Sequence, residues 1–296
     1  MMRIMPIRRL VDQRLPALAR LIRKRRDERL FKRDMQACAT YEYNSHTYSV
    51  NPSLLGQFGS RDANGELEAM NSLLKTGFDV FVDIGANHGL FSLLASSHSS
   101  CKTIIAVEPC FRNYQVLLRN IKKAAIRKEV IALHAAMGDL CEQRDLMGGL
   151  EGGSFVSGWG GVGSTYSERV QLLRIDQLKS LWKENSKVLV KIDAEGFEPQ
   201  ILRGAEELIK SQTASLVVEL SLTENHSAPD GRAYSKVFDF IFENGMKAFT
   251  FPGCQPISTD LVSLWVSGLA AQCQASHGRG NIPKRTLNIL FRPGSS

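Results

Sequence analysis

Apolar segments of strand length alternate with amphipathic segments along most of the chain after residue 60. The most apolar segment, Asp79 to Ile84, is typical of a strand buried on both faces of a parallel sheet. Six further core strands are expected at 103–108, 130–139, 187–192, 215–220, 247–251 and 286–291, with an additional strand at 169–174. Helical spacing of apolar residues follows at 65–76, 90–95, 176–182, 198–210 and 232–244. This alternation predicts an α/β fold built on a doubly wound, mainly parallel sheet of seven strands.

The first core strand leads into a glycine turn, G-A-N-H-G, and then into a helical pattern. Gly85 and Gly89 permit backbone torsions closed to other residues and remove Cβ atoms that would hold a ligand away from the main chain. A strand, such a turn and a helix N-terminus together bind cofactors that carry a nucleoside. Asn87 stands where a dinucleotide turn, G-x-G-x-x-G, has its second glycine, and Asp83 adds a carboxylate at the strand end. A carboxylate disfavours an anionic pyrophosphate and favours a cationic sulfonium, so the turn indicates S-adenosylmethionine.

Acidic residues also end the next two predicted strands. Glu108 lies 108 − 85 = 23 positions after Gly85, close to the spacing at which an acid accepts hydrogen bonds from two ribose hydroxyls. Asp139 ends the third strand, where we expect it to accept from an adenine amino group. One such acid alone could be a solvated loop carboxylate. Three in register favour a cofactor site.

Seven segments, in order from about Asn64 to Pro293, resemble the motifs of FkbM-type S-adenosylmethionine-dependent methyltransferases: VDIGANHGLFS, VEPCFRNYQVLLRNI, HAAMGD, LLRIDQL, LVKIDAEGFEPQILRGAEELI, LVVEL and NILFRP. The block from Lys191 to Ala205 is the most specific to this family. The resemblance implies a Rossmann-like methyltransferase fold with an antiparallel strand near the sheet edge. It also implies O-methylation, often of sugar hydroxyls on surface glycans or of natural products. The cofactor contacts that it implies are Asp83, Gly85, Asn87, Gly89, Glu108 and Asp139.

The resemblance does not cover the residues before Asn64. We therefore expect two parts, a basic amphipathic arm with a cover segment at 1–60 and the methyltransferase domain at 61–296. A chain of 296 residues that is 43% hydrophobic can bury one large core. It contains no run of eighteen apolar residues, and arginines interrupt the first twenty residues where a secretory signal would be apolar. Six cysteines without a C-x-x-C pair are typical of reduced thiols and indicate a cytoplasmic protein.

The net charge of +7 lies entirely in the N-terminal arm. Residues 1–30 hold ten Lys or Arg against three Asp or Glu, and the other 266 residues are balanced. Apolar residues recur there at helical steps, interrupted at Pro6 and Pro16. Two interpretations remain open: the arm docks on an anionic membrane at its inner face, or it packs on its own domain or on a second subunit. A nucleic-acid partner is not expected, because no aromatic residue precedes Phe31 and no basic surplus continues beyond the arm.

Two further segments predict structure near the cofactor edge. The segment from Tyr41 alternates polar and aromatic residues and predicts a hairpin or an extended cover. Residues 148–164 carry eight of the 24 glycines and predict a mobile hairpin or lid. Trp159 in that segment could stack on a sugar ring or anchor the loop on the core.

Candidate catalytic residues follow the later strands, where ligands bind in open α/β sheets. Methyl transfer to an alcohol requires positioning of the acceptor and removal of its proton. Asp193 and Glu195 follow the fourth core strand, and Asp193 is the first candidate for the base. Both carboxylates could instead hold their loop by accepting backbone N–H groups. His226, in the loop after the fifth core strand, is the alternative base. A metal site is not expected.

These observations favour a methyltransferase whose acceptor is a hydroxyl-bearing glycan or glycolipid precursor. A second hypothesis keeps the chemistry but assigns a secondary-metabolite hydroxyl. A third is a cofactor-binding interaction domain without turnover. A nicotinamide oxidoreductase is disfavoured by Asn87.

Overall fold

The computed structural model describes residues 64–148, 153–156, 166–222, 231–276 and 285–294, with scattered positions before residue 64. Those positions include two antiparallel strands, β1 (Ala39–Tyr43) and β2 (His46–Val50), which form the predicted hairpin. The hairpin lies beside helix α6 (Phe111–Lys123), whose Arg119 and Lys123 side chains both donate to the carbonyl of Ala37. It contributes no described residue to the cavity discussed below.

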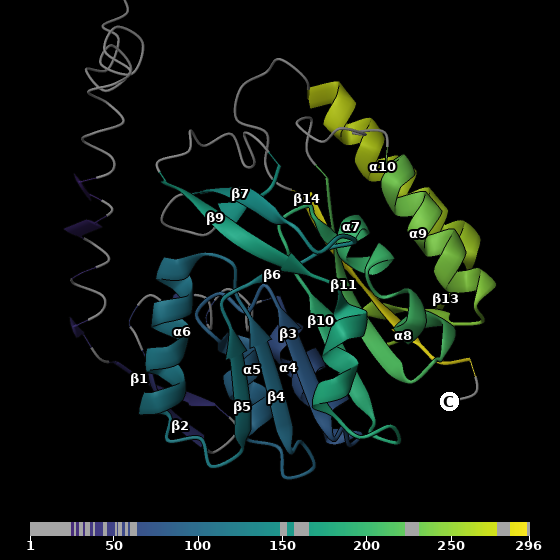
Figure 1. Cartoon of the computed structure of the whole chain (residues 1–296). Coiled ribbons are helices and arrows are strands. Elements are labelled where there is room, and N and C mark those ends of the chain that lie inside the picture. Colours follow the sequence, from purple (N-terminus) through teal and green to yellow (C-terminus); the bar gives the residue numbers. More distant parts are fainter. Residues whose placement is uncertain are drawn as a thin grey trace, which may run out of the picture.

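The main sheet has eight strands in the described part of the chain, in the order β13, β12, β14, β11, β10, β3, β4, β5 (Figure 1). Their bounds are β3 Val80–Ile84, β4 Thr103–Val107, β5 Glu129–Leu133, β10 Val188–Ile192, β11 Ala214–Leu222, β12 Lys247–Phe251, β13 Pro256–Ile257 and β14 Arg285–Arg292. Strands β11, β10, β3, β4 and β5 pair in parallel, whereas β14 runs antiparallel between β11 and β12. The predicted doubly wound, mainly parallel sheet is confirmed, and the short β13 adds an eighth strand at its edge.

Helices cover both faces of this sheet. Their bounds are α4 Glu66–Lys75, α5 Leu90–Ser96, α7 Glu198–Arg203, α8 Glu206–Lys210, α9 Arg232–Glu243 and α10 Thr259–Ser276. Helices α4 and α5 pack with the side chains of one face, and α7 to α10 pack with those of the other. The helix predicted over 198–210 is interrupted at Gly204, where a Cβ atom would lie 1.9 Å from the carbonyl oxygen of Gly138. No helix among the described residues has the length and apolar character required to cross a membrane.

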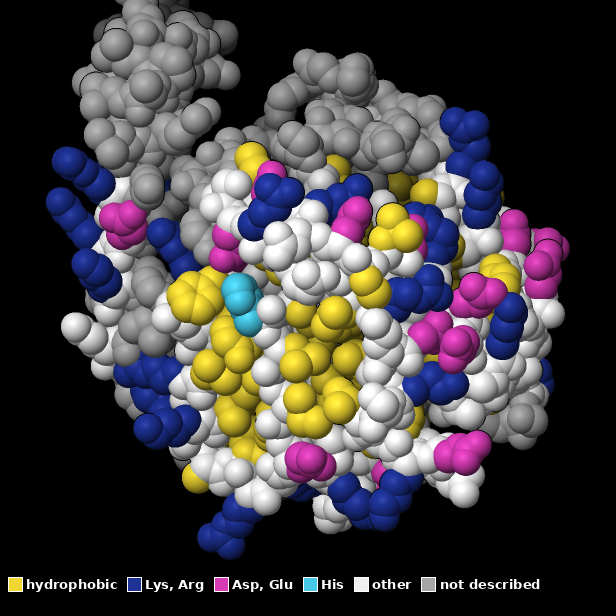
Figure 2. Space-filling view, viewed as in Figure 1, with side chains coloured by type: hydrophobic (Ala, Val, Ile, Leu, Met, Phe, Trp, Pro, Cys, Tyr) yellow, Lys and Arg dark blue, Asp and Glu magenta, His cyan; other side chains and the backbone are white. Residues whose placement is uncertain are grey.

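The connection from β5 to β10 differs from the prediction. The strand expected over 130–139 leaves the main sheet after Leu133, because Ala136 and Met137 form β6 and pair with β9 instead. A small sheet follows, with β7 (Gln143–Gly148), β8 (Gly153–Ser154) and β9 (Tyr166–Leu173), and then a 3-10 helix at Ile175–Leu181. This connection contains no α-helix in its described residues. Figure 2 shows apolar side chains at the surface over the region of β4 and β5.

The chain order in the main sheet reverses between β3 and β10. From β3 the chain proceeds outward through β4 to β5, and it then returns to β10 on the other side of β3. In open α/β sheets, ligands bind at the carboxyl ends of the strands beside such a reversal. The fold therefore predicts a binding site between the ends of β3, β4 and β10.

Candidate cofactor and acceptor site

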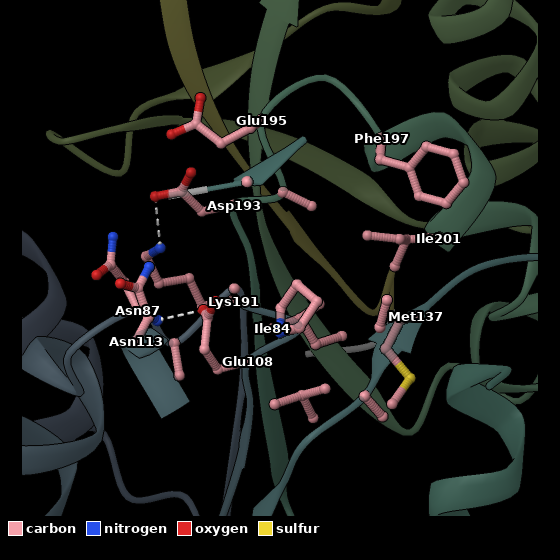
Figure 3. A pocket seen from close by; sticks show the side chains of 18 of the residues that line it. Ile84, Asn87, Glu108, Asn113, Met137, Lys191, Asp193, Glu195, Phe197 and Ile201 are labelled. Carbon is pink, nitrogen blue, oxygen red and sulfur yellow. Dashed lines mark hydrogen bonds and ion pairs between the residues drawn. The ribbon is translucent and has the colours of Figure 1, made fainter. Parts of the chain in front are cut away.

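A cavity of about 230 Å³ lies at this reversal point. Its lining comes from the ends of β3, β4 and β10, from β6, β7 and β8, and from the first turns of α5, α6 and α7. Figure 3 shows that the lining has two parts. Polar side chains lie on one side, with Asn87, Glu108 and Lys191 among them, and the apolar side chains of Met137, Phe197 and Ile201 lie on the other.

The glycine turn forms one edge of the cavity through Gly85 and Asn87. Gly85 has a φ of 77°, and a Cβ atom on it would lie 1.8 Å from the carbonyl oxygen of Asp193. Glycine is therefore required here because the turn and the loop after β10 touch at their backbones. The backbone N–H of Asp193 also donates to Ile84 O at 3.0 Å, which joins the ends of β3 and β10. Asn87 has a positive φ of 50°, a conformation that asparagine adopts more readily than most residues.

Glu108 lines the cavity at the end of β4, where its carboxylate is only 4% exposed. One oxygen accepts from Asn87 N at 2.8 Å and the other from Cys110 N at 2.9 Å. Burial raises the pKa of Glu108 to about 8, and these two N–H donors act in the opposite direction. The carboxylate is thus fixed in position and shares the cavity with the turn, as expected for a ribose acceptor.

Asp83 and Gly89 belong to the same motif but do not line this cavity. Asp83 is 1% exposed and accepts from Ser92 Oγ at 2.6 Å, while its other oxygen has no hydrogen-bond partner. Burial raises the pKa of Asp83, and the Lys191 ammonium opposes this shift. Gly89 has a φ of 92° at the start of α5, and a Cβ atom there would meet Leu117 at 2.6 Å. The structure gives Gly89 a packing role.

Asp139 lies apart from the cavity lining, contrary to its expected position beside the cofactor. Its carboxylate pairs with Arg203 of α7 at 2.9 Å, and Arg174 donates to its carbonyl oxygen at 3.0 Å. The reason is the early end of β5 at Leu133, which leaves Asp139 after β6 and not at the edge of the main sheet. Ala135, Ala136 and Met137 line the cavity in its place.

The loop after β10 brings Asp193 and Glu195 to the polar side of the cavity. Lys191, which is 3% exposed, pairs with Asp193 at 3.0 Å, and its ammonium lies 4.6 Å from the centre of the Phe91 ring. Glu195 has a positive φ of 53°, a conformation that residues other than glycine seldom adopt. Backbone conformations of this kind concentrate at functional sites, where the surrounding structure holds them.

None of the described histidines lines the cavity. His226 and Trp159 lie outside the described residues. His88 is buried before α5, and burial lowers its pKa to about 4, so its ring is neutral near pH 7. His134 follows the end of β5, where it contacts Pro109 O at 3.0 Å and stacks on Tyr114.

Sequence reasoning missed two kinds of lining residue. Lys191 is detectable in principle. It pairs in register with Asp83 on the neighbouring strand, so both side chains point to the same face of the sheet, and a buried lysine needs a nearby acid. Phe155 and Phe197 give no such signal, because apolar residues of the lining resemble those of the core. Their rings lie 4.8 Å apart at the apolar side of the cavity.

These residues fit S-adenosylmethionine in their chemistry. Glu108 supplies an acceptor for ribose hydroxyls, and Phe155, Phe197 and Met137 supply an apolar wall suited to an adenine ring. The unpartnered oxygen of Asp83 is a buried acceptor beside the same turn.

Comparison with protein families gives one match. The sequence model of the methyltransferase FkbM domain matches residues 83–247, which contain every cofactor and catalytic residue named above. No curated protein sequence matches the chain.

Solved structures resemble the chain at low sequence identity. A methyltransferase FkbM from Methylobacillus flagellatus is 17% identical, with a TM-score of 0.37, over 56% of this chain and 37% of that one. A precorrin-6y C5,15-methyltransferase from Geobacter metallireducens is 14% identical, with a TM-score of 0.39, over 77% and 86%. M. jannaschii TYW2 in complex with AdoMet is 12% identical, with a TM-score of 0.37, over 86% of each chain.

Proposed function

Since the chain belongs to the methyltransferase FkbM family and is an S-adenosylmethionine-dependent methyltransferase, we propose that it methylates a hydroxyl group of a sugar in a surface glycan or glycolipid precursor. The observation that carries this proposal is the pair of carboxylates, Asp193 and Glu195, on the polar side of the cavity. An alcohol must lose its proton when it accepts a methyl group, and a carboxylate in contact with the hydroxyl can take that proton.

The proposed roles divide along the cavity. Glu108 accepts hydrogen bonds from the ribose hydroxyls, and the turn at Gly85 and Asn87 contacts the cofactor through its backbone. When bound, S-adenosylmethionine supplies an electrophilic methyl group. Asp193 orients the acceptor hydroxyl and takes its proton, and the Lys191 ammonium, 3.0 Å away, holds the carboxylate in place. Most of the rate enhancement then comes from alignment of the acceptor oxygen with the methyl carbon.

The sugar acceptor rests on the family resemblance, and two alternatives make different predictions. A secondary-metabolite acceptor would appear in the small-molecule fraction of the cell. A cofactor-binding domain without turnover would bind S-adenosylmethionine and label nothing. The decisive measurement is mass spectrometry of surface glycans, glycolipids and small molecules from cells with and without the gene.

A glycan or glycolipid whose mass is higher by one CH₂ group only when the gene is present supports the proposal. Cells that express Asp193→Asn should lack this shift, and they control for indirect effects of the gene. A shift confined to small molecules would refute the sugar acceptor. Calorimetry in which the protein binds NADH but not S-adenosylhomocysteine would refute the proposed cofactor roles as well.

We further propose that the N-terminal arm docks on the inner face of an anionic membrane. Segregation of the whole net charge into residues 1–30 supports this, because basic residues near an anionic surface each contribute up to about 1 kcal/mol. Such docking would keep a cytoplasmic enzyme beside lipid-linked acceptors. The arm lies almost entirely outside the described residues.

A further inference from the structure

The loop after β10 is held from behind by a buried glutamate. Glu198, the first residue of α7, is fully buried and does not line the cavity. Its Oε1 atom accepts from Ala194 N at 2.9 Å and from Gly196 N at 3.1 Å. These two N–H groups flank Glu195, the residue with a φ of 53°. Glu198 therefore stabilises the backbone conformation that brings Glu195 to the cavity.

The second oxygen of Glu198 connects this loop to β11. It accepts from the hydroxyl of Tyr234 on α9, which is also fully buried. That hydroxyl in turn contacts both backbone groups of Ser221, with the amide nitrogen at 3.2 Å and the carbonyl oxygen at 3.0 Å. One chain of hydrogen bonds thus joins the loop after β10, helix α9 and the end of β11.

We propose that Glu198 and Tyr234 are positioning residues that set the loop from Asp193 to Phe197 in the geometry required for methyl transfer. The inference rests on the proposed function, because it assigns Asp193 and Glu195 to the acceptor side of the cavity. Neither Glu198 nor Tyr234 contacts the cavity, so both act through the loop.

The network accommodates both protonation states of Glu198. Burial raises the pKa of Glu198 to about 7, although the hydrogen bonds from the Tyr234 hydroxyl and the loop N–H groups lower it. Both protonation states therefore occur near neutral pH. When Glu198 is ionised, Tyr234 donates to it. When Glu198 is neutral, its O–H can donate to Tyr234, whose own O–H then donates to Ser221 O. The bonds from Oε1 to the loop persist in both states. Burial raises the pKa of Tyr234, and the carboxylates of Glu198 and of Glu219 on β11 raise it further.

Glutamine at position 198 reproduces the neutral state. Its carbonyl oxygen can accept both loop N–H groups, and its amide can donate to Tyr234. Glu198→Gln should therefore preserve the loop, whereas Glu198→Ala removes every bond. Tyr234→Phe deprives Glu198 of one partner and should have an intermediate effect. Tyr114→Phe is the matched control, because it removes a hydroxyl that bonds to Ala132 O at 3.3 Å, away from the cavity lining.

Residue-resolved hydrogen exchange on the full chain tests the loop without any acceptor. In Glu198→Ala, the amides of Ala194 and Gly196 should exchange at least about tenfold faster than in wild type, since each loses its hydrogen bond. Glu198→Gln should stay within about threefold of wild type, and Tyr114→Phe should be unchanged. Thermal unfolding of each variant shows whether Glu198→Ala has lost structure generally. If it has, the exchange rates of Glu198→Gln and Tyr234→Phe test the inference in its place.

Function is tested on the acceptor fraction found by the mass spectrometry above. At saturating S-adenosylmethionine, kcat should fall at least about tenfold in Glu198→Ala and recover in Glu198→Gln, while the affinity for S-adenosylhomocysteine stays within about twofold. Unchanged loop exchange in Glu198→Ala, or faster loop exchange with wild-type kcat, would overturn the inference. If wild type binds no S-adenosylhomocysteine, the proposed cofactor roles fail, and the exchange result still decides whether Glu198 holds the loop.

Discussion

Replacing Glu108 tests the cofactor side of the cavity most directly. Its two oxygens accept N–H groups from the glycine turn and from the start of α6, so these bonds fix the position of the side chain at the cavity. Glu108→Ala removes a charged acceptor for the ribose. Hydrogen bonds to charged groups contribute about 2 kcal/mol, so the affinity should fall roughly thirtyfold at pH 8.5.

The affinity should also depend on pH in wild type. The ionised carboxylate is the better acceptor, and burial raises the pKa of Glu108 to about 8 in the free protein. Below that pH, most molecules must lose a proton before the carboxylate accepts both ribose hydroxyls. The dissociation constant should therefore fall by about tenfold per pH unit between pH 6 and pH 7.5, and level off above pH 8.

Calorimetry with 5′-methylthioadenosine measures this cleanly, because the ligand keeps the ribose and adenine but lacks the amino-acid tail and its charges. Glu108→Gln should bind weakly at every pH, since its single carbonyl oxygen cannot accept from both Asn87 N and Cys110 N, and its affinity should not change with pH. Glu129→Gln is the control, because Glu129 is an exposed carboxylate that bonds to Thr103 on the sheet edge. A wild-type affinity that is constant from pH 6 to 8.5, or a pH dependence that persists in Glu108→Gln, would refute the reasoning.

Three further results are expected. Gly85→Ala should abolish ligand binding and lower the midpoint of thermal unfolding, because the new Cβ atom would lie 1.8 Å from Asp193 O and the φ is 77°. Backbone strain of this kind costs about 1–3 kcal/mol before the clash is counted. An unchanged midpoint would contradict the structure. Asp193→Asn keeps a hydrogen-bond acceptor for Lys191 but not the charge, so kcat should fall at least about a hundredfold with nearly unchanged affinity for S-adenosylhomocysteine; equal kcat values would exclude Asp193 as the base. The full chain should sediment with anionic vesicles and not with neutral ones, in a salt-dependent way, whereas a chain that starts near Phe31 should not sediment; equal sedimentation of both chains would exclude docking through the arm.

The sequence predicted the strands that form the floor of the site because parallel strands buried on both faces are continuous apolar segments. The ends of β3, β4 and β10 fall within one residue of their predicted positions, and Gly85, Asn87, Glu108, Asp193 and Glu195 consequently line one cavity. Asp139 does not line this cavity, because its expected position depended on a strand that continues to residue 139 in the main sheet. The apolar segment continues past Leu133, but apolarity does not reveal that Ala136 and Met137 pair with β9 in another sheet.

Tertiary packing determines several features that the hydrophobic pattern of the sequence did not predict. Helix α10 was not predicted, and the helix over 198–210 was expected to be continuous, because nothing local shows that Gly204 meets the backbone of Gly138. Lys191 lies in the most recognisable motif of the chain, yet only the register against Asp83 makes it a buried partner of two acids. Sequence position fixes which residues reach the edge of the sheet, whereas the neighbouring strand determines what they meet there.

The loop after β10 resolves part of an ambiguity that the sequence left open. Asp193 and Glu195 could have served either to hold their loop through backbone N–H groups or to meet an acceptor. The N–H groups of Ala194 and Gly196 donate to Glu198, which reaches the loop from its buried side. Since a third carboxylate supplies those bonds, Asp193 and Glu195 can extend toward the cavity, where Lys191 compensates the charge of Asp193 at 3.0 Å. The bonds to Ala194 and Gly196 that hold this loop therefore come from Glu198, while Asp193 and Glu195 both line the cavity, where an acceptor hydroxyl would meet them.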